Sequence, residues 1–393
     1  MKKYTTKYLQ EEIIKARPWA LTAIILRISA LFPKIKPAFM DTIAVVGEVP
    51  NPCFFLYKAL KELGSDVPWW MRSIFYLAEK IVPDCIMNAI LGFVVNVILI
   101  PYFEIVDERA FEKAKEKYKK DGSKIILDIV GEAARNEKEA DTYMKSYKYV
   151  MREFGGKMAV KPSSLAWKPD KELLKQKLTE LFSEAKDYPD VSITIDAEEY
   201  FEWHHVTEEA FLETIVEPRF RAMKNELGIA LQTYRKDVLE SAVKIIETAQ
   251  KRKNPIRVRV VKGAYWGDEH TIAKKLGQEF PLFETQEGTD QSFDDIVMFL
   301  LMNRRYIYVS PATHNAKHIA FAIDCTRGNY SHFEFEVLTG MGESIRRVLC
   351  KLGVPVSVYC PLIRKGGTPK EGMKYLIRRV KEVTENCHVL KNV

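Results

Sequence analysis

The sequence predicts an α/β protein built on a closed barrel of eight parallel strands, a (β/α)8 or TIM-type barrel, with a helical extension at its N-terminus. Two observations carry this prediction. After Lys120, eight short runs rich in β-branched and aromatic residues alternate with longer stretches of helical spacing. Such alternation is typical of a parallel sheet whose strands are joined by helices. Residues 1 to about 122 read instead as apolar and helical, without that alternation.

The eight predicted strands are bounded by turn residues and polar clusters. They are Lys124–Ile129, Lys157–Pro162, Val191–Asp196, Gly228–Tyr234, Ile256–Lys262, Tyr306–Ala312, His332–Leu338 and Val354–Tyr359. The fifth run alternates β-branched residues with arginines, and this period of two indicates a strand.

The helices between these strands are predicted from apolar residues at helical spacing. They are Glu137–Phe154, Lys171–Lys186, Thr207–Lys224, Asp237–Lys253, Gln291–Asn303, Ala316–Cys325, Gly342–Lys351 and Pro369–Glu385, with an additional helix at Asp268–Leu276. We place the domain boundary between a helical region, residues 1–122, and the barrel, residues 123–393.

Two apolar segments precede the barrel. Residues 85–103 carry no charged side chain and are nearly long enough to span a bilayer. Asn88, Asn96 and Pro101 interrupt this segment, which favours a buried helix and strand. Contact with a membrane is the alternative, and residues 18–33 are a second candidate for surface association.

Composition excludes several classes of protein. The 393 residues carry a net charge of +7, but the basic residues are spread among acidic ones, so nucleic-acid binding is not expected. The six cysteines include no CxxC pair, which argues against a zinc or dithiol site and fits a reducing compartment. The N-terminus does not resemble a secretory signal. We therefore expect a cytoplasmic protein, with peripheral association at the inner face of the membrane as an open addition.

Chemically useful side chains gather where the predicted strands end, which is the face of such a barrel that holds reactive groups. In chain order they are Asp128, Glu132, Lys161, Asp196, Gln232, Arg259, Lys262, Thr313, His314, Asn315, Glu334, Glu336, Leu338 and Tyr359, followed by Arg378 and Arg379 on the last helix. Gly263 and Ala264 leave the backbone bare after the fifth strand, so a flat, anionic ligand could lie there. An ordinary strand-to-loop junction with surface arginines is the alternative.

Each of these groups also has a purely structural interpretation. Lys161 and Asp196 could form a buried ion pair with each other. Two adjacent arginines usually mark a solvated helix face, although the planar guanidinium also suits bidentate binding of a carboxylate. A run of acids and histidines resembles a metal site, but its spacing is a weak signal and an exposed helix is preferred. That run comprises Asp196, Glu198, Glu199, Glu202, His204 and His205. We predict no metal.

A set of motifs occurs in a fixed order between Lys124 and Asn386. They are LDIVGEAARNEKEADTYMKSY, VKPSS, ITIDAEE, GIALQTY, RVRVVKGAYW, TDQSF, ATHNA, FEFEVLTGMGE, VYCP and YLIRRVKEVTEN. Each motif is weak alone, but together they make the chain resemble the flavin-dependent proline dehydrogenase family, including the dehydrogenase domain of bifunctional bacterial proline-utilisation proteins. The first 120 residues carry little of the resemblance.

The resemblance implies a distorted (β/α)8 barrel that holds FAD. It implies oxidation of L-proline to Δ1-pyrroline-5-carboxylate by hydride transfer to flavin N5, the first step of proline catabolism, with a membrane quinone as electron acceptor. Because the sequence shows no aldehyde-dehydrogenase half and no DNA-binding segment, a monofunctional member is expected.

The resemblance also assigns roles to individual residues. Arg378 and Arg379 match the pair that binds the substrate carboxylate, with Lys161 as a third cation. Asp196 matches the catalytic-site aspartate, beside that lysine. Arg259 matches the arginine near flavin N5, where a cation favours the reduced flavin.

The remaining matches concern packing and cofactor contacts. Tyr359 and Leu338 match residues that pack on the pyrrolidine ring, and Glu132 matches the glutamate that pairs with one substrate arginine. The implied FAD contacts are Ala197, Gln232, Lys262, Gly263, Ala264, Thr313, His314 and Glu382.

The chain departs from the family pattern at a few positions. Glu336 stands where the family commonly has glutamine, and Gln286 where a basic residue is often found. Hydroxyproline dehydrogenase is the alternative enzyme, but the bulky Tyr359 should crowd a 4-hydroxyl group. The alternative outside the enzymes is a binding module, a barrel that binds flavin or another ligand but has lost turnover. Retention of the candidate catalytic and carboxylate-binding residues argues against it.

Overall fold

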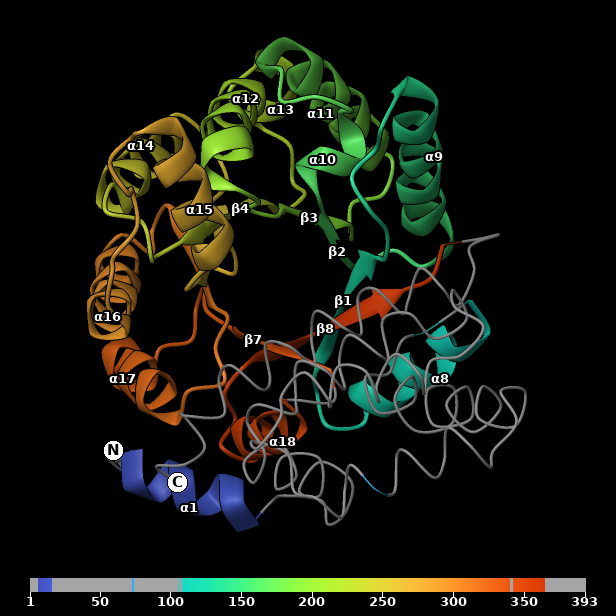
Figure 1. Cartoon of the computed structure of the whole chain (residues 1–393). Helices are drawn as coiled ribbons and strands as arrows, with labels where there is room; N and C mark the ends of the chain where they lie inside the picture. The colour runs from blue at the N-terminus through green and yellow to red at the C-terminus, as the bar shows by residue number, and fades with distance from the viewer. Residues whose placement is uncertain (1–5, 16–72, 74–105, 107, 340–341, 365–393) are drawn as a thin grey trace. The chain divides into compact units, whose positions relative to one another are not determined.

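The short β-rich runs of the sequence form a ring of parallel strands surrounded by helices (Figure 1). The computed structural model describes residues 6–15, 73, 106, 108–339 and 342–364. The strands are β1 (Lys124–Ile129), β2 (Lys157–Val160), β3 (Ser192–Ile195), β4 (Leu227–Gln232), β5 (Ile256–Val261), β6 (Ile307–Pro311), β7 (Phe335–Leu338) and β8 (Val356–Leu362).

The strands pair in the order β6-β5-β4-β3-β2-β1-β8-β7, and every pair is parallel. Two parallel bridges, Val309 with Phe333 and Ala312 with Glu336, connect the β6 and β7 ends of this order. The backbone N–H of Glu334 also donates to the carbonyl of Val309 at 3.2 Å. These contacts close the sheet into the predicted (β/α)8 barrel.

Helices follow the strands as crossover connections. Preceding the barrel are α1 (Thr6–Lys15) and α8 (Glu108–Lys119). Within the barrel are α9 (Glu137–Glu153), α10 (Pro162–Leu165), α11 (Lys171–Ala185), the π-helix η3 (Tyr200–His204), α12 (His205–Ile215), α13 (Pro218–Arg221), α14 (Val238–Gln250), α15 (Trp266–Leu276), α16 (Gln286–Met302), α17 (Ala316–Thr326) and α18 (Glu343–Lys351). Several begin at a capping side chain, as where Asp170 accepts from the Leu173 N–H at 2.9 Å.

Apolar side chains pack between the helices and on the outer face of the sheet. On α11, Leu174, Leu178 and Phe182 recur at helical spacing and are fully buried. The Phe182 ring meets Phe211 and Phe220 edge-on, with centroids 6.3 and 5.9 Å apart. Burying each such side chain contributes roughly 1.5–3 kcal/mol, so these contacts hold the helices against the barrel.

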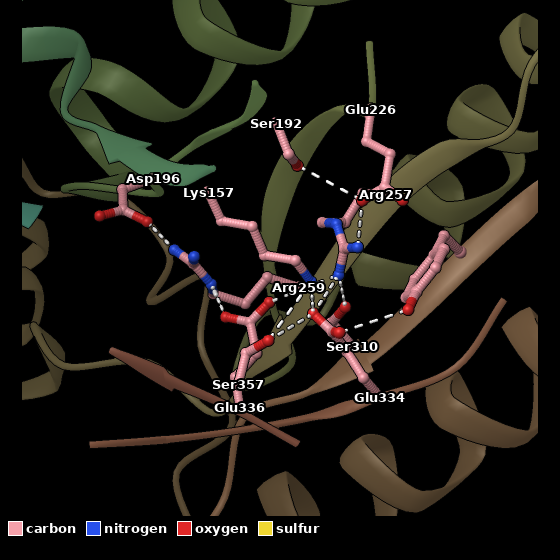
Figure 2. A network of polar contacts seen from close by, with 11 residues as sticks. Lys157, Ser192, Asp196, Glu226, Arg257, Arg259, Ser310, Glu334, Glu336 and Ser357 are labelled. Carbon is pink, nitrogen blue, oxygen red and sulfur yellow. Dashed lines mark hydrogen bonds and ion pairs between the residues drawn. The ribbon is translucent and has the colours of Figure 1, made fainter. Parts of the chain in front are cut away.

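The barrel interior contains a network of ion pairs (Figure 2). Arg257 on β5 donates to Glu334 at 2.6 Å and to Ser310 at 2.7 Å, and it also pairs with Glu226. Lys157 on β2 pairs with the same Glu334. Burial opposes ionisation of Glu334, but Arg257 and Lys157 outweigh it and lower its pKa to about 2. The inward charges of separate strands therefore neutralise one another inside the barrel.

Two predicted elements differ from the structure for identifiable reasons. The helix predicted over Thr207–Lys224 is broken before Pro218, where Glu217 has φ −55° and ψ 143°. A residue before proline avoids the helical region. The seventh strand starts at Phe335 rather than at His332, because His332 has φ 55°, in the left-handed region. The last predicted helix, 369–385, lies outside the described residues.

The chain divides into two compact units, residues 1–16 with 106–365 and residues 17–105 with 366–393. The first unit contains the barrel, α1 and α8. The predicted boundary at 122/123 differs from this division and stays a prediction. No helix in the described ranges is both long and apolar enough to cross a bilayer. The apolar segments 18–33 and 85–103 lie outside those ranges.

Candidate active site

Two side chains from separate strands contact Asp196, which lies directly after β3. Arg259 on β5 forms an ion pair with Asp196 Oδ1, and the Tyr359 hydroxyl on β8 donates to Asp196 Oδ2 at 2.8 Å. The Arg259 guanidinium lies 5.1 Å from the centroid of the Tyr359 ring. Figure 2 shows Asp196 and Arg259 facing each other. The structure therefore brings together the two predicted catalytic residues and one residue predicted to contact the substrate.

A second carboxylate holds the other side of Arg259. Its Nε donates to Oε2 of Glu336 on β7, and Glu336 is only 2% exposed. Oε1 of Glu336 lies 4.0 Å from Nη1 of Arg257. Arg259 is thus fixed between two acids that come from different strands.

Lys161 occupies the N-cap position of α10, immediately after β2, and its side chain makes no capping hydrogen bond. Its Nζ lies 3.0 Å from Asp128 Oδ1 and 3.5 Å from the carbonyl oxygen of Ile129. Since Lys161 pairs with Asp128 while Asp196 pairs with Arg259, the structure does not support the alternative in which Lys161 and Asp196 pair with each other. Lys161 still contributes to the field at Asp196.

Charge and burial act in opposite directions at Asp196. Burial raises the pKa of this carboxyl above its ordinary value, against the opposing effects of Arg259, the Tyr359 hydroxyl and Lys161. Burial also disfavours the charged form of Arg259, but Glu336 and Asp196 outweigh it and raise the pKa of the guanidinium. The arginine therefore stays charged throughout the working pH range.

The prediction overlooked Glu198 as a structural part of the site. Glu198 accepts from the backbone N–H of Ser163 at 2.8 Å and from the Ser163 hydroxyl at 2.6 Å. It thereby ties the segment after β3 to the segment that carries Lys161. Burial raises the pKa of Glu198 to about 7, although both Ser163 bonds oppose this. A second acid two residues after Asp196, at a barrel strand end, was the signal in the sequence.

The segment after β5 has the bare backbone that the sequence suggested. Gly263 has φ 134°, and a Cβ there would lie 2.4–2.5 Å from ring carbons of Tyr234. Only glycine fits this conformation and this close contact. Lys262 pairs with Asp290 on α16, while Gly263 and Ala264 remain exposed.

The ends of β6 and β7 are joined by a histidine. The backbone N–H of Leu338 donates to Nε2 of His314 at 3.1 Å, so the ring proton is assigned to Nδ1. Thr313 accepts from the N–H of Asn315 at 3.1 Å. His314 thus links the segment after β6 to Leu338 at the end of β7, and Thr313 precedes it in the segment after β6.

A protein-family model described as "Pro_dh: Proline dehydrogenase" matches residues 111–392. The chain belongs to the proline dehydrogenase family. This confirms the resemblance noted in the sequence, and the match includes the whole barrel.

Individual relatives agree with the family match. The "Bifunctional protein PutA" of Klebsiella aerogenes is 27% identical over 303 residues, 70% of this chain and 23% of that protein. "Proline dehydrogenase 1" of Bacillus subtilis is 27% identical over 293 residues, 72% of this chain and 85% of that protein. The chain therefore spans less than a quarter of the bifunctional relative but most of the Bacillus one.

Among solved structures, proline utilization A of Bdellovibrio bacteriovorus, inactivated by N-propargylglycine, matches with a TM-score of 0.81 at 24% identity. The match covers 96% of this chain and 41% of that one. Proline utilization A from Corynebacterium freiburgense matches with a TM-score of 0.65 over 74% of this chain and 32% of that one. These likenesses show the shared barrel fold.

The proline dehydrogenase barrel presents unsatisfied polar atoms that fit a flavin. Gln232 Oε1 on β4 and Arg259 Nη2 on β5 are both buried without a hydrogen-bond partner in the part of the chain that the structure describes. Leaving such a group unpaired costs about 1–3 kcal/mol. The pyrimidine part of an oxidised flavin ring carries one N–H donor together with carbonyl and ring-nitrogen acceptors. It can therefore satisfy an acceptor and a donor on adjacent strands.

For the remaining predicted site residues, the structure gives a position in the chain and a degree of burial, or they lie outside the described residues. Ala197 is half-buried directly after Asp196, and Glu132 is exposed in the segment after β1. The predicted carboxylate-binding pair, Arg378 and Arg379, and the predicted cofactor neighbour Glu382 lie outside the described residues. Their roles stay predictions.

The acidic and histidine run weighed as a metal site is divided in the structure, since Asp196 faces Arg259 and Glu198 faces Ser163. A different trio, His204, His205 and Asp237, offers ligand atoms within 4.8 Å of one another. However, Arg235 donates to Asp237 at 2.9 Å. Burial and then Arg235 lower the pKa of His204 to about 2. A cation already neutralises this carboxylate, which disfavours a metal ion.

Proposed function

We propose that the protein is an FAD-dependent proline dehydrogenase that oxidises L-proline to Δ1-pyrroline-5-carboxylate. The observation that carries the proposal is the arrangement at the barrel strand ends of this family member. Arg259 is buried and held by Asp196, and its Nη2, like Oε1 of Gln232 on the neighbouring strand, has no hydrogen-bond partner among the described residues. The Bacillus relative, named a proline dehydrogenase and matched over 85% of its length, supports the same substrate.

Lys161 supplies positive charge for the substrate carboxylate. Asp128 fixes the direction of the ammonium group with one oxygen at 3.0 Å. The ammonium has three donors. Asp128 and the Ile129 carbonyl at 3.5 Å take two of them, which leaves one for a carboxylate. We propose that Arg378 and Arg379 complete the carboxylate site, since guanidinium groups bind carboxylates in a bidentate manner.

Tyr359 and Asp196 position the reacting ring. The 2.8 Å hydrogen bond fixes the Tyr359 hydroxyl, so its ring presents a rigid apolar face for the pyrrolidine carbons. Leu338, held through His314, adds a second apolar contact. Holding reactants in a reactive geometry supplies several kcal/mol of catalysis. No protein nucleophile is needed.

FAD, when bound, would supply the two-electron acceptor for the hydride lost from proline C5, with flavin N5 as the proposed acceptor atom and the amine lone pair of proline as the source of the new C=N bond. The residues that would hold it are Gln232, Arg259, Lys262 and His314, with Gly263 leaving the backbone accessible. We propose further that the electrons pass to a membrane quinone. A cytoplasmic location with peripheral association at the inner face of the membrane fits that role, through the apolar segments 18–33 and 85–103.

The test is a visible absorption spectrum of the purified protein before and after anaerobic addition of L-proline, with trans-4-hydroxy-L-proline in a parallel sample. A flavin spectrum that bleaches with L-proline supports the proposal. If only hydroxyproline bleaches the flavin, hydroxyproline rather than L-proline is the substrate. A flavin that no imino acid bleaches would point to a lapsed enzyme, and absence of flavin after reconstitution with FAD would leave a binding module.

Flotation of the full chain with anionic liposomes tests the membrane association separately. Co-flotation that is lost in uncharged liposomes supports peripheral, charge-assisted binding. A chain that stays at the bottom of the gradient in both cases contradicts it.

A further inference from the structure

The interior of the barrel holds a network of cations and carboxylates around its two arginines. In the network of Figure 2, Arg257, Arg259 and Lys157 face four carboxylates. These acids are Asp196, Glu226, Glu334 and Glu336. Lys161 and Asp128 form a separate, neutral pair. Glu226 is 45% exposed, so within the described part of the chain the buried charges of this network balance, three cations against Asp196, Glu334 and Glu336.

Glu336 is the acid of this network that shares Arg259 with the candidate catalytic residue Asp196. Glu334, Glu226 and their partners lie at the level of Arg257, two residues before Arg259 along β5. Glu336 instead holds Arg259 through Nε, while its Oε1 lies 4.0 Å from Nη1 of Arg257 and has no hydrogen-bond partner among the described residues. At 2% exposure, water screens this charge little.

The guanidinium of Arg259 therefore already pairs with two carboxylates, and only its Nη2 is without a hydrogen-bond partner among the described residues. Asp196 holds Nη1 and Glu336 holds Nε. A ligand that gains negative charge at Nη2 meets a cation weakened by two nearby anions. The electrostatic effect of an arginine on a bound redox group depends on this net charge, because reduction adds negative charge to the group.

We propose that Glu336 lowers the reduction potential of the bound flavin by neutralising Arg259. This inference rests on the proposed function, since it requires a flavin beside Nη2. Glu336 also positions the guanidinium, but its electrostatic role is separable, because glutamine keeps an acceptor for Nε while it removes the charge.

The experiment is a spectroelectrochemical titration of the flavin in the wild-type holoenzyme and in Glu336→Gln, Glu336→Asp and Glu226→Gln. A charge a few ångströms from a reacting group typically changes its equilibrium by a factor of ten or more. We expect E336Q to favour the reduced flavin about tenfold, an upward shift of about 30 mV for a two-electron couple. We expect E336D, which keeps the charge but withdraws it by one methylene, to shift upward less than E336Q.

E226Q is the matched control. It removes a carboxylate from the same network, but one that contacts Arg257 rather than Arg259 and is half exposed. We expect the equilibrium between oxidised and reduced flavin to change less than twofold in E226Q. Circular dichroism and flavin content establish that each variant is folded and loaded. Should E336Q not fold, Glu336→Met, which also removes the charge, is titrated in its place, and a change of less than twofold in the flavin reduction equilibrium overturns the inference.

The outcomes separate this inference from the proposed function. If proline bleaches the wild-type flavin but the flavin reduction equilibrium of E336Q lies within twofold of the wild-type one, Glu336 does not tune the reduction potential. If the flavin reduction potential shifts more in E336D than in E336Q, Glu336 acts only by positioning Arg259, and the inference is overturned. If the wild-type protein binds no flavin, the proposed function fails first, and the inference fails with it.

Discussion

The buried carboxyl of Glu198 makes a testable contribution to stability. Its pKa of about 7 lies above the ordinary value of 4.5, so the folded protein binds this proton more tightly than the unfolded chain does. The stabilising effect of the proton is complete below pH 4.5 and is lost as the pH rises from 4.5 through about 7. With about 1.36 kcal/mol for each pKa unit, the loss is about 3 kcal/mol.

Glu198→Gln imitates the protonated acid permanently. Its amide oxygen can accept the Ser163 N–H, and its NH2 group can donate to the Ser163 hydroxyl. The free energy of unfolding of E198Q, relative to wild type, should therefore rise by up to about 3 kcal/mol between pH 4.5 and pH 8. Urea denaturation at a series of pH values, with linear extrapolation, measures this difference.

Glu343→Gln is the matched control. Burial disfavours the charged form of Glu343, but hydrogen bonds from Arg346 outweigh it and lower its pKa. Its contribution is therefore present above pH 4.5 and lost only below that value, so E343Q should show no trend relative to wild type between pH 5 and 8. A flat difference for E198Q over the same range, within about 0.5 kcal/mol, would refute the burial argument for Glu198.

Three further substitutions test the site. Arg259→Lys cannot pair with both carboxylates, so the rate of flavin reduction by proline should fall about 100-fold in stopped-flow measurements; an unchanged rate would remove Arg259 from the reaction. Tyr359→Phe keeps the ring but deletes the bond to Asp196, and should lower the free energy of unfolding by about 1 kcal/mol. Equal stability would mean that water replaces the hydroxyl. Gly263→Ala forces a Cβ against Tyr234 at positive φ, so flavin content per protein should drop and unfolding should become easier by about 1–3 kcal/mol; full flavin content would contradict the close packing.

The strands of the barrel could be predicted because their pattern is local. β5 is an example: Val258 and Val260 are fully buried against the helices, and the alternation with arginines is visible in the sequence. The alternation alone could not tell which set of side chains, the valines or the arginines, points into the barrel. Arg257 and Arg259, at 2% and 4% exposure, point into the barrel rather than to solvent. The alternative of surface arginines is therefore wrong.

The candidate site was predicted by residue identity and strand position, not by partner. Lys161 and Asp196 were correctly placed at strand ends, yet the structure gives each a different partner. Asp128 lies 33 residues from Lys161 along the chain, and Arg259 lies 63 residues from Asp196. Only the strand order brings such residues together, so no local pattern could specify these ion pairs.

The same argument explains why Glu336 matters to the fold as well as to the site. Arg259 and Glu336 lie on β5 and β7, which are not neighbours in the sheet, and β6 stands between them. Their contact crosses the barrel interior at the level where Ala312 bridges to Glu336 and joins β6 to β7. A slip of one residue in this closure would turn Glu336 out of the barrel and leave Arg259 with one acid fewer. Breaking a buried ion pair in this way costs about 3–5 kcal/mol. The charges that prepare Arg259 for its ligand therefore also select the register in which the barrel closes.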